Sequence, residues 1–259
     1  MFSTVVSADA TTIGYESVGS GPPLVLVHGA TADRTRWAPV VARLAERYTV
    51  HLVDRRGRGL STAEADRYDV RREGEDVAAV VAAVGPDVYL YGHSYGALCS
   101  LEAAMISDAI GRLALYEPPM ESPGLHVIEP DVLARLRTVT DRESLLEAFF
   151  REALQLPQAA VDTMKGTPAW QARLAAVHTI LRELDQVIRF RADERLSKID
   201  IPVRLFRGTE SPAYLVAATD AVAGRITGAD VVSLHGQAHQ AMDGDPDQFV
   251  ATVFAFGSR

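Results

Sequence analysis

Short apolar runs alternate with longer amphipathic segments through the first 120 residues of the chain. Four runs contain almost no polar residue, which is typical of strands that are covered on both faces. They lie at 24–27, 50–53, 88–91 and 113–116. Three segments with helical spacing of apolar residues follow such runs. They lie at 36–47, 72–84 and 95–107, and the shorter runs at 5–6 and 12–15 predict an N-terminal hairpin.

The pattern changes after residue 120. Residues 121–197 contain no convincing strand, and five stretches in them are typical of helices, at 130–138, 141–155, 158–164, 168–180 and 183–192. Strand and helix patterns then resume at 203–206, 213–224, 230–234 and 246–256. Strands that alternate with helices form βαβ crossovers and a parallel sheet. We therefore expect an α/β core at 1–120 and 198–259, with a mostly parallel eight-stranded sheet, helices on both faces and a helical lid at 121–197.

Composition excludes several classes of protein. The 259 residues carry a formal net charge of −8, which disfavours nucleic acids and anionic membranes as partners. The lone Cys99 cannot form an internal disulfide, and no Cys/His spacing suggests a metal site. The first residues are typical of neither a signal peptide nor a membrane span, so we expect a cytoplasmic protein. A monomer or small homo-oligomer that acts on a small molecule fits these observations.

The strongest chemical signal is Gly92-His93-Ser94-Tyr95-Gly96. It matches G-x-S-x-G between a buried strand and a helix, the setting that raises a serine hydroxyl above the end of a sheet. Side chains at the two glycines would collide with the backbone of so tight a turn. The pattern therefore predicts Ser94 as a nucleophile.

A serine hydroxyl needs a base within hydrogen-bond reach, and the base needs an orienting acid. His239 follows the last predicted strand, where a loop can bring it to Ser94. His235 is a second candidate for the base, but it directly extends that strand and does not lie in the loop after it. We expect His239 to be the base.

Two further motifs complete a resemblance. His28-Gly29-Ala30 ends a strand, and residues 54–61 read Asp-Arg-Arg-Gly-Arg-Gly-Leu-Ser. With the Ser94 turn and His239, they make the sequence resemble the α/β-hydrolase superfamily over nearly its whole length. The resemblance implies an oxyanion hole formed by the backbone N–H groups of Ala30 and Tyr95. It implies neither a metal nor an organic cofactor.

The acid departs from the family pattern, because Ser211 occupies the usual aspartate position after the strand at 203–206. Two carboxylates could substitute. Glu117 ends the strand at 113–116, and parallel strand ends meet at one edge of the sheet. Glu210 is adjacent to the usual position but should point differently. We favour Glu117 and keep Glu210 as the alternative.

The expected function is cleavage of a small ester, thioester or lactone through an acyl-enzyme on Ser94. An acyltransferase or cyclase would use the same residues, and a non-catalytic ligand-binding protein is a further alternative. Trp170 and Phe149 of the predicted lid are candidate substrate contacts, although apolar residues at helical spacing mostly pack against each other.

Overall fold

The computed structural model describes residues 1–62 and 68–258 of the chain. Its single eight-stranded sheet has the order β1-β2-β4-β3-β5-β6-β7-β8. The strands are β1 (Phe2–Val6), β2 (Thr12–Val18), β3 (Pro23–Val27), β4 (Thr49–Val53), β5 (Val88–His93), β6 (Ile110–Tyr116), β7 (Val203–Gly208) and β8 (Asp230–Leu234). The six strands from β4 to β8 run parallel, and β2 and β1 add an antiparallel edge. The expected sheet is confirmed.

Helices cover both faces of the sheet, and the strand sequences show why. Alternate residues of a strand point to opposite faces. Val25 and Val27 of β3 pack in one cluster with α2 (Val70–Val84), α3 (Tyr95–Ala104) and α9 (Ala213–Ala223). Leu24 and Leu26 pack in a second cluster on the other side, which includes α11 (Pro246–Gly257). A strand buried on both faces needs a continuous apolar run, and β3 has one.

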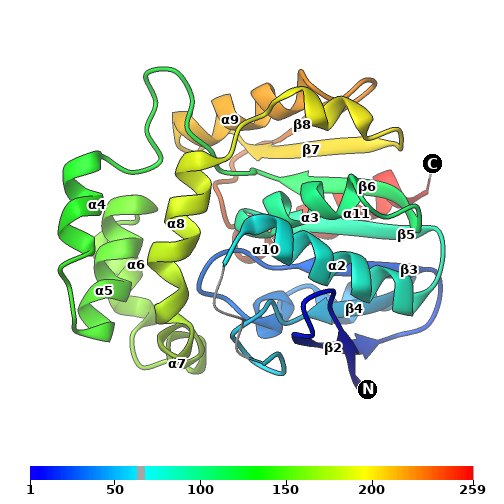
Figure 1. Cartoon of the computed structure of the whole chain (residues 1–259), viewed down its shortest axis with the longest axis horizontal. Helices are drawn as coiled ribbons and strands as arrows, with labels where there is room; N and C mark the ends of the chain where they lie inside the picture. Colours follow the sequence, from blue (N-terminus) through cyan, green and yellow to red (C-terminus); the bar gives the residue numbers. More distant parts are fainter. Residues whose placement is uncertain (63–67, 259) are drawn as a thin grey trace.

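Helices also form the segment between β6 and β7, which we call the helical insertion (residues 121–197). They are α4 (Pro130–Leu136), α5 (Arg142–Ala148), α6 (Gln158–Met164), α7 (Pro168–Ala175) and α8 (Ile180–Arg189), with a π-helical turn at Phe149–Ala153 and a 3₁₀ turn at Val177–Thr179. Figure 1 shows them beyond the arrowheads of β6 and β7, with α8 nearest the sheet. They bury an apolar cluster of their own.

Three predicted helices differ from the observed ones. The segment 168–180 divides into α7, a 3₁₀ turn at Val177–Thr179 and the first residue of α8. The segment 36–47 forms a 3₁₀ turn at Arg34–Trp37 and a separate helix α1 (Val41–Leu44), because Pro39 between them has no N–H group to donate. The segment 141–155 begins as α5 and continues as the π-helical turn. Within the described ranges, no helix combines the length and the apolar character needed to cross a bilayer.

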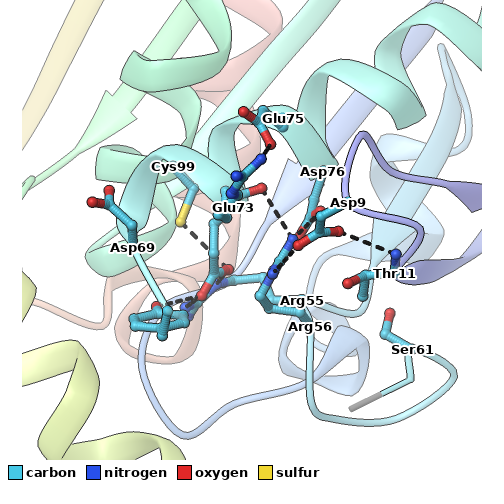
Figure 2. A network of polar contacts seen from close by, with 12 residues as sticks. Asp9, Thr11, Arg55, Arg56, Ser61, Asp69, Glu73, Glu75, Asp76 and Cys99 are labelled. Carbon is cyan, nitrogen blue, oxygen red and sulfur yellow. Dashed lines mark hydrogen bonds and ion pairs between the residues drawn. The ribbon is translucent and has the colours of Figure 1, made fainter. Parts of the chain in front are cut away.

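Buried arginines after β4 tie the elements together. Arg55 donates to Glu73 of α2 at 2.5 Å and to Glu183 of α8 at 2.8 Å. Arg56 forms a two-pronged pair with Asp76 of α2, with both N–O distances at 2.7 Å (Figure 2). Buried charges are costly unless they are paired in this way. The Arg55–Glu183 pair joins the helical insertion to the core.

The Arg56–Asp76 pair gives a prediction about stability. Asp76→Asn should lower the free energy of unfolding by about 3 kcal/mol, the low end of the range for breaking a buried pair, because Asp9 still contacts Arg56 at 2.9 Å. Glu75→Gln is the matched control on the same helix. Its partner Arg72 is 44% exposed, so the loss should stay below about 1 kcal/mol. Urea unfolding measures both, and equal losses would contradict the prediction.

Candidate active site

Ser94 occupies a strained turn between β5 and α3. Its backbone has φ of 56° and ψ of −126°, a sparsely populated conformation for a residue with a side chain. The N–H of Ser94 donates to the Tyr116 carbonyl at 2.8 Å, which anchors the turn to β6. The side chain remains 8% exposed, and Ser94 lines two cavities. The turn therefore presents the hydroxyl to an open space above the sheet edge.

The two glycines of the turn are needed because a side chain at either position would collide with backbone, as the sequence predicts. A Cβ added at Gly92 would lie 2.6 Å from the Cα of Ala97 and from the carbonyl oxygen of Gly96. A Cβ at Gly96 would lie 2.5 Å from the carbonyl oxygen of His28 and would also overlap that of Val27. These atoms belong to the backbone and cannot rotate away. The close approach of α3 to the end of β3 thus depends on glycine.

His239 and Glu117 are brought together from two different strand ends. The Glu117 Oε2 atom lies 2.6 Å from Nδ1 of His239, and its Oε1 accepts the N–H of Gly208 at 2.7 Å. Glu117 is fully buried. Glu210 is exposed, and its carboxylate lies 3.3 Å from Thr209 Oγ1. Of the two predicted acids, the structure places Glu117 beside the imidazole.

Two aromatic side chains hold the His239 loop, and no local pattern in the sequence predicts either role. Nε2 of His93 lies 2.7 Å from the His239 carbonyl oxygen, and the Tyr116 hydroxyl donates to the Ala238 carbonyl at 2.6 Å. Burial, with a smaller effect of His239, lowers the pKa of His93 well below its ordinary value. The ring is therefore neutral, and its carbonyl partner assigns the proton to Nε2. In the motif, His93 stands at the variable position.

The expected oxyanion residues lie on the same side of the site. Ala30 lines both cavities that Ser94 lines, and Tyr95 lines the second of them. Helix α3 begins at Tyr95, so its dipole favours negative charge there. Arg55 supports both residues. Its Nη1 donates to the Gly29 carbonyl at 3.2 Å, and its guanidinium stacks 4.4 Å from the centre of the Tyr95 ring.

The two candidate substrate contacts of the helical insertion have different positions. Phe149 lines the second cavity together with Ser94. Trp170 lines neither cavity. Its ring lies 6.1 Å from that of Phe150, its Nε1 donates to Glu143 at 3.2 Å, and it is 1% exposed. Trp170 therefore lies outside these two cavities, because its indole packs in the apolar cluster of the helical insertion.

A serine on a strand–helix turn beside a His–Glu pair defines the class of hydrolases built on an α/β sheet. The model of the Alpha/beta hydrolase family matches residues 24–252, and the chain belongs to this family. Among the described residues, no group of three His, Cys, Asp or Glu side chains could hold a metal ion.

Known proteins resemble the chain over different lengths. A pimeloyl-[acyl-carrier protein] methyl ester esterase of Stenotrophomonas maltophilia is 30% identical over 255 residues, 92% of this chain and 93% of that protein. N-formylmaleamate deformylase of Pseudomonas putida is 38% identical, but over 41% of each protein. The crystal structure of an alpha/beta hydrolase from Sphaerobacter thermophilus superposes with a TM-score of 0.85 at 34% identity, covering 98% of this chain and 99% of that one.

The turn at Ser94 gives a second prediction. Gly96→Ala should lower the free energy of unfolding by about 1–3 kcal/mol, because the new methyl group meets fixed backbone. Gly224→Ala is the control. Gly224 has a helical φ of −65° and a nearest neighbour at 3.4 Å, so alanine there should be neutral or slightly stabilising. Urea unfolding compares the two, and a Gly96→Ala protein as stable as the Gly224→Ala protein would refute the steric argument.

Proposed function

We propose that this protein is a serine hydrolase that cleaves an ester- or amide-type bond of a small molecule through an acyl-enzyme. The observation that carries the proposal is the 2.6 Å contact between His239 Nδ1 and Glu117 Oε2, beside a serine in a strained turn. Two relatives are named an esterase and a deformylase, so the proposal covers acyl–oxygen and acyl–nitrogen bonds.

In the first half of the reaction, Ser94 attacks the acyl carbon and passes its proton to His239. The Nδ1–H of His239 donates to Glu117, which leaves Nε2 as the basic atom. Glu117 also stabilises the imidazolium that forms. Gly208 donates to the other carboxylate oxygen, and this second bond keeps Glu117 turned toward the ring. His239 then returns the proton to the leaving group.

The backbone N–H groups of Ala30 and Tyr95 are the proposed donors to the oxyanion. Such donors act where negative charge develops, and the loss of one costs on the order of 10²- to 10³-fold in rate. In the second half of the reaction, His239 activates water, which attacks the acyl-enzyme and releases the acid. The helical insertion acts as a lid, since Phe149, Ile180 and Leu184 close one side of the second cavity.

The first test is hydrolysis of 4-nitrophenyl esters with acyl chains from two to eight carbons. Wild type should turn over, and Ser94→Ala should lose about 10⁴-fold or more, because no other group forms the acyl-enzyme. A fluorophosphonate probe should label the wild type and spare Ser94→Ala. Wild type that hydrolyses no ester and resists the probe would overturn the proposal, whereas an acyl group found on another nucleophile would favour acyl transfer.

The acid is tested by a matched pair of variants on the same esters. Glu117→Gln should lower kcat by about 10³- to 10⁴-fold, because an amide at this position favours the wrong imidazole tautomer. Glu210→Gln removes an exposed charge outside the site and should change kcat by less than about threefold. If Glu210→Gln gives the larger loss, the structural assignment of Glu117 is wrong.

A further inference from the structure

One of the two cavities at Ser94 has a charge opposite to that of the whole molecule. It is lined by Ser94, His239, Arg36 and Arg173, and by no aspartate or glutamate among the residues described. The chain as a whole carries a net charge of −8. The net negative charge of the protein would by itself favour a negative potential in its cavities. The two arginines therefore distinguish this cavity from the rest of the molecule.

Arg36 is already neutralised by a partner. Its guanidinium makes two contacts with Asp243, each at 2.8 Å. Asp33, which lines the neighbouring opening, accepts the N–H of Thr35 at 2.8 Å. Both carboxylates are therefore hydrogen-bonded to other groups, although their charges still act on Arg173.

Arg173 of α7 has no such partner. Among the described residues, no carboxylate forms an ion pair with it, and its one hydrogen bond goes to Thr31 Oγ1 at 3.0 Å. Its guanidinium lies 5.2 Å from the centre of the Phe150 ring. Burial, with a smaller effect of Arg36, lowers the pKa of Arg173 to about 10, and the charges of Asp243 and Asp33 act in the opposite direction. The side chain therefore keeps its charge at neutral pH, in a cavity that Ser94 also lines and without an ion-pair partner among the described residues.

We propose that Arg173 binds a carboxylate of the substrate, so that the preferred substrates are small esters or amides that carry a free carboxylate. This inference rests on the proposed function and adds the substrate class to it. A guanidinium presents a planar set of donors that matches a carboxylate, and one unpaired positive charge balances one negative charge. The remaining apolar part of the substrate would occupy the second cavity, which Phe149, Leu184 and Val187 line.

The bond from Arg173 to Thr31 defines an alternative role for Arg173, because the Thr31 hydroxyl donates to the Ala30 carbonyl at 2.7 Å. Through this chain Arg173 could support the oxyanion loop, or its charge could stabilise the oxyanion itself. Either role would help every substrate equally. A carboxylate subsite helps the anionic substrate alone, so the ratio of kcat/KM for an anionic and a neutral substrate separates the roles.

The experiment uses monophenyl glutarate and its neutral methyl ester, phenyl methyl glutarate, with spontaneous hydrolysis subtracted. Wild type should prefer the anion by about 10- to 100-fold in kcat/KM, the value of a charged hydrogen bond. Arg173→Gln should bring this ratio close to one and leave the neutral ester within about threefold of wild type. Arg173→Lys keeps the charge without the planar fork and should retain part of the preference.

Two control variants accompany these. Arg137→Gln removes a positive charge from the helical insertion at an exposed pair with Asp185, and it should leave the ratio unchanged. Thr31→Ala removes the hydroxyl that contacts both Arg173 and the Ala30 carbonyl, but it keeps the cation. Any loss of rate should therefore be the same for both substrates. A wild-type ratio of one or less, or an Arg173→Gln variant that slows both substrates equally, would overturn the carboxylate subsite while ester hydrolysis stands.

A binding measurement tests the carboxylate subsite even if the protein hydrolyses no ester. Ser94→Ala cannot form an acyl-enzyme, so calorimetry with this variant measures affinity for the same two compounds. The anionic compound should bind about 10- to 100-fold more tightly than the neutral one, and Arg173→Gln in the same background should remove the difference. Equal affinities would overturn the subsite on their own. Selective binding without any turnover would retain the subsite and reject the proposed function.

Discussion

The rest of the site depends on one buried carboxylate. Glu117 has no exposed surface and lies in the left-handed region with φ of 48°. A carboxylate moved out of water is costly unless its oxygens are hydrogen-bonded, and both oxygens of Glu117 have a partner, Gly208 on one side and His239 on the other. Glu117 follows β6, Gly208 ends β7 and His239 lies in the loop after β8. The carboxylate therefore joins these three segments at a single point.

The position of the nucleophile is coupled to the same region. Ser94 donates its N–H to Tyr116, the residue before Glu117. His93, the residue before Ser94, contacts the carbonyl of His239. Neighbouring residues at the ends of β5 and β6 thus hold both Ser94 and His239 in place. The strain at Ser94 is sustained because the surrounding backbone is fixed by these bonds and by the glycines.

The arginines divide into a structural set and a ligand-binding candidate by their partners. Arg55 and Arg56 are buried and have carboxylates from α2 within 2.7 Å. Their charges are therefore paired, and the pairs join the loop after β4 to α2. Arg173 lines a cavity together with Ser94 and has a hydroxyl and an aromatic ring as neighbours. The site therefore combines a buried carboxylate at Glu117 with a guanidinium at Arg173, an arrangement that can orient a substrate with an anionic end.

The sheet, the position of Ser94 and the family were predictable from the sequence, because they depend on local patterns: continuous apolar runs, and a G-x-S-x-G turn between a strand and a helix. It also narrowed the acid to two residues, since strand ends meet at one edge. The three-dimensional arrangement was needed to choose Glu117 over Glu210, to assign His93 to the support of His239 and to place Trp170 in the core of the helical insertion. It was also needed to show that Arg173 has no ion-pair partner among the described residues. Each of these depends on contacts between residues far apart in the chain, and no local spacing encodes which partner a side chain meets.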